Sequence, residues 1–285
     1  MRQIEKTYKK GVLRKLLIKI CRLLGYELID QADMSFITSF NKENASIIGK
    51  KSITLPLGEI KIKRKIQSLD IILKTCTAVN LVSQNKNRIF EHKKSEYTFR
   101  TINSLIKSLK KSEKNTKNIN FQITVIDTGS SKEDKETMQK ILEKSKFKFN
   151  FIELNLVDYL QRIKVIKKNN TQIESNMKST MASIIKSFEI SKNSDDLVYF
   201  VEDDYIHNVD CISEMLSVYE KFSTILEDEI FLIPVDYPYL YQKDHSTNIL
   251  IGQKYHWRSV TESLLTFLTS KKMINKYYNE LIKIG

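Results

Sequence analysis

Residues 197–205 read Leu-Val-Tyr-Phe-Val-Glu-Asp-Asp-Tyr and decide the predicted fold. The five apolar residues indicate a strand buried on both faces, as in a parallel sheet. Glu202, Asp203 and Asp204 follow this strand at once. Neighbouring carboxylates repel one another unless a cation neutralises them, and oxygen ligands suit Mg²⁺ or Mn²⁺. The stretch predicts a metal site at the strand end, with a plain turn before a helix starting near Val209 as the alternative.

The segments around this strand alternate between strand and helix patterns. Apolar strands are expected at 69–75, 121–126, 149–154 and 197–201, and helices near 96–111, 132–145 and 176–191. Strands separated by helices pair in parallel through right-handed crossovers. We therefore expect an α/β domain over residues 67–285, with a mostly parallel sheet flanked by helices and a ligand crevice at the carboxyl ends of the strands.

Several common uses of such a sheet are disfavoured by missing motifs. The sequence has no Gly-x-Gly-x-x-Gly and no Gly-Lys-Ser/Thr, the glycine motifs that let a backbone approach phosphate. It has no His-Glu-x-x-His and no Cys-x-x-Cys pair among its 3 cysteines. Dehydrogenases, P-loop enzymes, typical Rossmann methyltransferases and cysteine zinc sites lose their support. The cysteine usage fits a reducing, cytoplasmic setting.

A second strand also ends in an acid. Residues 123–131 read Ile-Thr-Val-Ile-Asp-Thr-Gly-Ser-Ser, so that Asp127 ends the strand and a small polar turn leads into a charged helix. The Asp127 carboxylate could accept hydrogen bonds from a base or a ribose. Turn and N-cap chemistry also favours these residue types at a strand-to-helix junction, whatever the function.

Asp127 with the turn at 129–131, followed by the acids at 202–204, resembles the nucleotide-sugar domain of GT-A glycosyltransferases, especially bacterial family 2-type enzymes. The resemblance covers residues 67–285. It implies a metal-dependent enzyme that moves a sugar from a nucleotide-diphosphate donor to a glycan or lipid-linked acceptor. The glutamate in the first place of the aspartate-x-aspartate motif is a departure that leaves the donor sugar open.

The resemblance also implies roles for individual residues at the strand ends. Small polar residues after the first strand would touch the nucleotide, and Asp127 would contact the base. Asp204 would bind Mn²⁺ or Mg²⁺, while the two acids before it would face the donor. The donor-binding residues implied in this way are Thr75, Cys76, Thr77, Asp127, Glu202 and Asp203.

The C-terminal third holds a second group of candidates. Residues 255–258 read Tyr-His-Trp-Arg after a short strand expected at Asn248–Ile251, and an aromatic loop spans residues 235–241. By the same resemblance, His256 would complete the metal shell and Arg258 would stabilise the leaving diphosphate. The aromatic loop is equally compatible with local packing or with stacking on sugar faces. The alternative for residues 255–258 is a histidine at a strand edge beside a packed tryptophan.

An inverting transfer needs a carboxylate that takes the proton of the acceptor hydroxyl. Asp236 in the aromatic loop and Glu262 are the candidates. Glu262 is preferred because it opens an expected helix that continues through Phe267, a place where GT-A enzymes carry an acceptor-side acid. In a retaining enzyme neither assignment need hold.

The N-terminus carries the excess of positive charge. Residues 1–24 hold eight basic residues against Glu5 alone and so carry +7 of the chain's net charge of +13. Leucine and isoleucine recur at helical spacing between Lys9 and Leu24, which predicts a basic amphipathic helix over residues 1–25 and a connector over 26–66. The helix would bind the inner face of an anionic membrane, or dock on its own domain. The basic run Lys61–Lys65 is expected to be solvated or to face the membrane.

Two other classes of function stay open at this point. One is another metal-dependent phosphotransfer enzyme, such as a nucleotidyltransferase or nuclease, although its usual glycine-rich loop is missing. The other is a noncatalytic domain that binds a membrane or a polyanion. Specific nucleic-acid binding is not expected, because no recognition module is present.

Overall fold

The computed structural model describes residues 12–26, 61–78, 93–116, 118–163, 171–237, 247–262 and 264–284. The chain divides into two units, Met1–Ile60 and Lys61–Gly285. In the first unit the structure describes α1 (Val12–Leu23), which confirms a helix over that part of the predicted span 1–25. Residues 1–11 and residues 27–60 of the predicted connector lie outside the described residues. Part of the aromatic loop, residues 238–241, lies outside the described residues.

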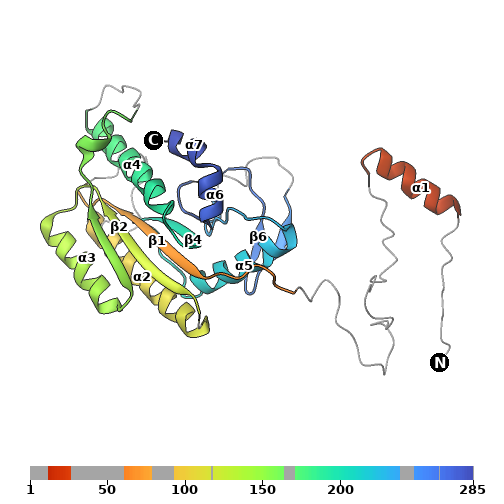
Figure 1. The fold of residues 1–285 in the computed structure, drawn as a ribbon, viewed down its shortest axis with the longest axis horizontal. Coiled ribbons are helices and arrows are strands. Elements are labelled where there is room, and N and C mark those ends of the chain that lie inside the picture. The colour runs from red at the N-terminus through yellow and green to blue at the C-terminus, as the bar shows by residue number, and fades with distance from the viewer. Residues whose placement is uncertain are drawn as a thin grey trace. The chain divides into compact units, whose positions relative to one another are not determined.

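The second unit is built on a five-stranded sheet with the strand order β3-β2-β1-β4-β7 (Figure 1). The strands are β1 (Ser68–Thr75), β2 (Asn120–Asp127), β3 (Lys148–Glu153), β4 (Leu197–Glu202) and β7 (Phe267–Ser270). The first four are parallel to one another, and β7 pairs antiparallel with β4. The expected mostly parallel α/β sheet is confirmed.

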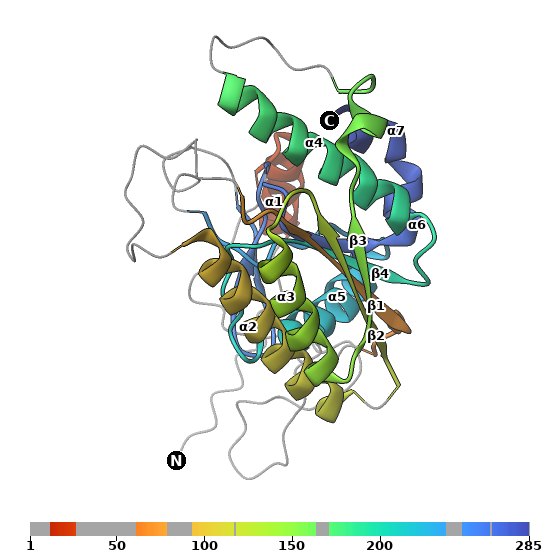
Figure 2. The ribbon, with the colours of Figure 1, turned by 90° about the vertical axis from the view of Figure 1, so that its left-hand side faces the viewer.

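Helices cover both faces of the sheet (Figure 2). One face carries α2 (Lys94–Asn115), α3 (Lys132–Ser145) and α5 (Cys211–Leu226). The other carries α4 (Thr171–Ser191), α6 (Lys271–Lys276), α7 (Tyr278–Leu281) and the 3-10 turns η1 (Leu156–Tyr159) and η3 (Ile282–Ile284). The helices predicted near 96–111, 132–145 and 176–191 correspond to α2, α3 and α4.

The central strands bury side chains on both faces, which explains their largely apolar pattern. In β1, Ile71 and Leu73 pack into the hydrophobic cluster formed with α2, α3 and α5. Ile72, between them, packs on the opposite side with residues of α4 and α6. Because successive strand residues point to opposite faces, a sheet covered by helices on both sides needs apolar residues on both faces of its strands.

The helix expected to begin at Glu262 is wrong. Phe267 starts strand β7, which adds to the edge of β4, and all four residues of β7 are buried. The next helix, α6, begins only at Lys271, where the Ser270 hydroxyl accepts a hydrogen bond from the amide of Met273 and caps it. Short apolar runs fit a strand or a helix equally well, and pairing with β4 decided this one.

The end of the segment predicted as a connector is bound to the second unit. Arg64 forms ion pairs with Asp196 and Glu229, and its side chain is only 20% exposed. The amides of Lys63 and Arg64 both donate to the Thr224 hydroxyl. Arg64 is therefore not the solvated residue that its basic neighbours suggested, and the ordered chain entering β1 includes it.

Candidate functional site

The carboxyl ends of three neighbouring strands meet at one edge of the sheet. Thr75 at the end of β1 pairs in register with Asp127 at the end of β2. On the other side of β1, Lys74 pairs in register with Glu202 at the end of β4. The strand-end residues predicted from the sequence are therefore brought together, and we call this group the strand-end cluster: residues 74–77, Asp127 and 202–204.

Asp127 organises the turn after β2. It is 3% exposed, and one carboxylate oxygen accepts hydrogen bonds from the hydroxyls of Thr75 and Ser130. The other oxygen accepts from the amides of Gly129 and Ser130, at 3.2 and 3.0 Å. The carboxylate thus holds the loop before α3 in place, and its contact with a nucleotide base stays a prediction.

Thr77 is bound to the same turn. Its amide donates to the Ser130 hydroxyl at 3.0 Å, and its own hydroxyl donates to Asp134 in the first turn of α3 at 2.6 Å. The ends of β1 and β2 are consequently tied into one polar rim.

Asp203 is buried among donors of the same edge. Its Oδ1 accepts from the Lys94 ammonium at 2.5 Å, and its Oδ2 accepts from the Thr98 hydroxyl at 2.8 Å and from the amide of Cys76 at 3.3 Å. The carboxylate therefore joins the start of α2 to the ends of β1 and β4. A charge this well paired is stable inside a protein.

Glu202 is paired with a lysine. The Lys74 ammonium lies 3.4 Å from Glu202 Oε1, and the Lys74 side chain is 9% exposed. Burial lowers the pKa of Lys74, while the charge of Glu202 opposes that effect. Mutual repulsion among the acids is thus relieved by two lysines, Lys74 and Lys94, and by the exposure of Asp204.

The strand-end cluster fits a divalent cation that is shared with a ligand. Among the described residues, no group of three or more His, Cys, Asp or Glu side chains could hold a metal ion alone. Mg²⁺ is commonly bound by one or two carboxylates together with water and substrate phosphates. Exposed Asp204, with Glu202 beside it, matches that pattern better than a closed protein cage.

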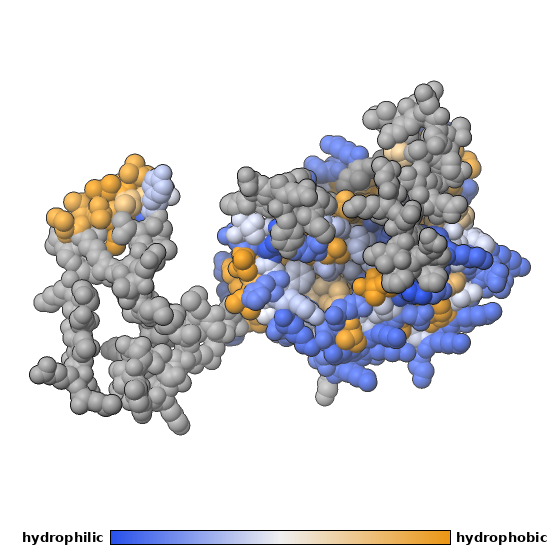
Figure 3. Space-filling model, turned by 180° about the vertical axis from the view of Figure 1, so that it is seen from behind, coloured by the Kyte–Doolittle hydropathy of each residue, from blue (hydrophilic) through white to orange (hydrophobic). Residues whose placement is uncertain are grey.

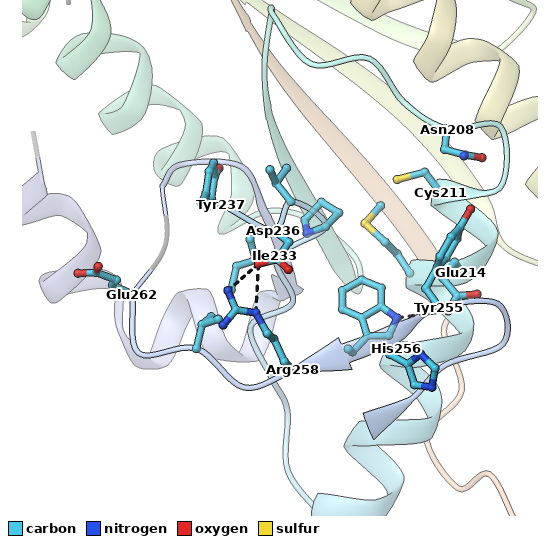
Figure 4. A pocket seen from close by; sticks show the side chains of 15 residues that line it. Asn208, Cys211, Glu214, Ile233, Asp236, Tyr237, Tyr255, His256, Arg258 and Glu262 are labelled. Carbon is cyan, nitrogen blue, oxygen red and sulfur yellow. Dashed lines mark hydrogen bonds and ion pairs between the residues drawn. The ribbon is translucent and has the colours of Figure 1, made fainter. Parts of the chain in front are cut away.

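Beyond β4, the second unit contains a pocket of about 380 Å³. It lies between the start of α5, the segment after Leu232 and a hairpin of β5 (Ile249–Ile251) and β6 (His256–Arg258). Figure 4 shows the lining side chains, which include Met215, Ile233, Asp236, Tyr237, Tyr255, His256, Trp257, Arg258 and Glu262. Four predicted site residues, Asp236, His256, Arg258 and Glu262, therefore line one pocket; Asp204 does not line it.

Glu214 of α5 holds the hairpin wall of this pocket. It is 3% exposed, and its carboxylate accepts from the amides of Gln253 and Lys254, both at 3.0 Å. It also accepts from the amide of Tyr255 at 3.4 Å and from Trp257 Nε1 at 3.2 Å. One buried carboxylate thereby fixes the turn between β5 and β6.

The polar residues of the pocket are divided between its sides. Arg258 Nη2 donates to Asp236 Oδ1 at 2.6 Å, and Arg258 Nε donates to the same oxygen at 3.1 Å. In Figure 4, Glu262 and His256 lie on opposite sides of this ion pair. A metal role for His256 and a diphosphate role for Arg258 stay predictions.

A tyrosine pair joins the strand-end cluster to the pocket. The hydroxyl of Tyr205, the residue after the three acids, is hydrogen-bonded to the hydroxyl of Tyr237 at 3.0 Å. Tyr237 lines the pocket. Asn208 and Cys211, which follow Tyr205 closely in the chain, line it as well. The cluster and the pocket are therefore adjacent parts of one candidate site.

Burial raises the pKa of Cys211 to about 12, so this thiol is uncharged at neutral pH.

Three residues that are important to this geometry, Lys74, Lys94 and Glu214, were not identified from the sequence. Lys74 follows the apolar run Ile71–Leu73 in β1, and a lysine at the end of a buried run was the one signal available. Lys94 lies in a helix rich in charged residues and Glu214 in an amphipathic one, where nothing in the sequence separates a buried lysine or glutamate from a solvated one.

No protein-family model matches the sequence, and no curated protein matches it. Among solved structures, the chain is similar to S. aureus TarS, with 13% identity and a TM-score of 0.32 over 58% of this chain and 21% of that chain. It is also similar to the galactosyltransferase LgtC in complex with donor and acceptor sugar analogues, with 12% identity and a TM-score of 0.36 over 75% of this chain and 64% of that chain. The chain spans less than two thirds of either protein's length in these structures. Both likenesses are weak, and the function below is argued from this chain's own residues.

Proposed function

We propose that this chain is a glycosyltransferase that moves a sugar from a nucleotide-diphosphate donor to a hydroxyl of a glycan or lipid-linked acceptor. The donor would occupy the strand-end cluster, and the acceptor would enter the adjacent pocket. This is the activity implied by the resemblance of residues 67–285 to GT-A enzymes of the family 2 type.

The observation that carries the proposal is that the acidic strand-end cluster lies next to the aromatic pocket. An acidic strand edge suits a cation and a diphosphate, and an aromatic pocket suits a sugar ring. The Tyr205–Tyr237 hydrogen bond links the two. A noncatalytic polyanion-binding domain would have no need of the acidic edge.

The site is proposed to use Mn²⁺ or Mg²⁺, with Asp204 as its carboxylate ligand and Glu202 beside it. When bound, the cation would neutralise the charge that develops on the departing diphosphate. Lys74 and Lys94 keep Glu202 and Asp203 in place at the edge, so that neither acid has to turn away from its neighbour.

Proton transfer from the acceptor is assigned to Glu262, with Asp236 as the rival. Asp236 Oδ1 already accepts two hydrogen bonds from Arg258, which suits a residue that positions a ligand. Glu262 is exposed on another side of the pocket, where an incoming hydroxyl can reach it. A general base of this kind is expected to contribute about 10²–10⁴-fold to the rate.

We propose that the N-terminal helix binds peripherally to an anionic membrane. Figure 3 shows hydrophobic side chains gathered on α1, where Leu13 and Leu23 are 84% and 79% exposed. Each nearby Lys or Arg adds about 1 kcal/mol of attraction to an anionic leaflet. None of the helices in the described ranges is long and apolar enough to cross a bilayer.

A thermal-shift panel tests the proposed donor site. Nucleoside diphosphates and their sugar derivatives are each added with and without Mn²⁺ or Mg²⁺, because a ligand that binds only the folded state raises the melting temperature. Stabilisation by at least one diphospho-sugar in the presence of the cation is expected. No stabilisation by any member of the panel would contradict the proposal.

A further inference from the structure

The pocket beside α5 has a preformed wall. Four donors of the hairpin, three of them backbone amides, converge on the buried carboxylate of Glu214. A Cβ added to Gly252 would lie 2.1 Å from Glu214 Oε1, so the backbone approaches this side chain as closely as it can. A wall fixed in this way loses little conformational entropy when a ligand binds.

The apolar part of the lining is aromatic and lies beside polar groups. Tyr255, Trp257 and Tyr237 line the pocket together with Met215 and Ile233. Aromatic side chains combine a broad apolar face with a polar group at one end. A sugar ring has the same two properties, since its carbon-bound hydrogens form apolar faces and its hydroxyls lie around the rim.

The charges of the pocket favour an uncharged ligand. The negative charge of Glu214 is stabilised by uncharged N–H donors, and Asp236 is paired with Arg258. Glu262 adds a further negative charge to the lining. An anionic group brought into this pocket would meet the carboxylates of Glu214 and Glu262 in addition to the Asp236–Arg258 pair. Like charges at short range are unfavourable.

The Asp236–Arg258 pair suits neighbouring hydroxyl groups. The carboxylate only accepts hydrogen bonds and the guanidinium only donates them, so the two side by side complement two hydroxyls of which one donates and one accepts. The volume of about 380 Å³ lies near the lower end of the range typical of small-molecule sites, about 300–1,000 Å³. One or two sugar rings are the matching size.

We propose that this pocket binds an uncharged pyranose unit of the acceptor, with an aromatic face of the pocket against the ring and the Asp236–Arg258 pair on two of its hydroxyls. This inference rests on the proposed glycosyltransferase function, and it names the chemical class of the acceptor.

The chain's single tryptophan provides the measurement. Trp257 lines the pocket, so its fluorescence reports occupancy there without contribution from other indoles. The full chain is titrated with methyl glycosides of glucose, galactose, mannose and N-acetylglucosamine, and with glucuronic acid as the anionic counterpart. A saturable change with at least one neutral glycoside is expected, together with at least tenfold weaker binding of glucuronic acid.

Two variants and a control show where the sugar binds. Tyr255→Ala removes an aromatic wall and Arg258→Ala removes the guanidinium donor; each is expected to weaken the neutral glycoside about tenfold. Tyr26→Ala, at an exposed tyrosine of the first unit, should leave the titration unchanged. Circular dichroism spectra and melting temperatures are recorded for all three, so that a variant that fails to fold is recognised and the other variant decides.

The thermal-shift panel with diphospho-sugars is run on the same protein. If a diphospho-sugar stabilises the chain but no neutral glycoside changes Trp257 fluorescence, the pocket assignment is overturned while the proposed function stands. Tighter binding of glucuronic acid than of every neutral glycoside would also overturn it. If glycosides bind as expected and no diphospho-sugar stabilises the chain, the pocket assignment is supported and the proposed donor site fails.

Discussion

Gly252 and Glu214 are in such close contact that no side chain larger than hydrogen fits between them: an added Cβ would lie 2.1 Å from Glu214 Oε1 and 2.9 Å from Trp257 Nε1. The contact allows the turn of the β5–β6 hairpin to wrap around a buried carboxylate. The pocket wall therefore depends on two residues about 40 positions apart in sequence.

Gly252→Ala is expected to destabilise the hairpin by about 1–3 kcal/mol, because overpacking a filled site forces neighbouring atoms to shift. Urea unfolding followed by Trp257 fluorescence measures the loss. Gly25→Ala is the control, because a Cβ there meets no atom within 4 Å and only the left-handed backbone angle is affected. Unchanged folded-state fluorescence and stability in Gly252→Ala would show that the turn is looser than described.

Stability is expected to fall as the pH is lowered through the range in which His207 would gain a proton. Burial lowers the pKa of His207 to about 4 in the folded chain, from 6.5 when unfolded. Below pH 6.5 the unfolded chain therefore binds the proton more readily, and stability decreases until about pH 4. The full loss is about 3 kcal/mol.

His207→Gln provides the comparison for this pH dependence. Glutamine does not titrate, yet it can still bond to the Tyr199 hydroxyl, which lies 3.1 Å from His207 Nε2. Urea titrations between pH 7 and pH 4 should show a shallower decline in the variant. Parallel declines in the two proteins would mean that other groups dominate.

Glu262→Gln is expected to keep donor binding and to lose about 10²–10⁴-fold in sugar transfer, because an amide cannot accept the acceptor's proton. Asp236→Asn is measured beside it under saturating donor. If Asp236→Asn abolishes turnover and Glu262→Gln does not, the base lies at Asp236. Full activity in both variants would point to a retaining mechanism, which the anomeric configuration of the product checks.

Replacing Leu16 and Leu17 of α1 by glutamate should abolish sedimentation with vesicles that contain phosphatidylglycerol. The change removes apolar contact and adds two negative charges to a basic helix. Val157→Glu, at a 68% exposed position of η1, is the matched control and should sediment like the unmodified chain. If the double variant instead lowers the melting temperature, the helix packs on the protein and the membrane role fails.

Sequence patterns identified the parallel strands and their helices because nearly every residue of β1 and β4 is buried, which leaves short apolar runs such as Ile71–Leu73 and Leu197–Val201. They also identified the strand-end residues, since parallel strands end at one edge. They did not identify β7, whose four residues become a strand only through pairing with β4. The hairpin wall depends on the distant pair Gly252 and Glu214, and no local pattern reports a contact between them.

The most direct test of the central claim is to detect a glycosidic product. The chain is incubated with each diphospho-sugar and each neutral methyl glycoside in the presence of Mn²⁺ or Mg²⁺, and products are analysed by mass spectrometry. The account predicts a glycoside heavier by one sugar residue for at least one combination, and loss of that product in Asp204→Asn, which removes the anionic ligand without changing volume. Equal product formation by Asp204→Asn would contradict the metal assignment. Absence of any product in every combination, with no donor hydrolysis and no donor-induced stabilisation, would contradict the proposed function itself.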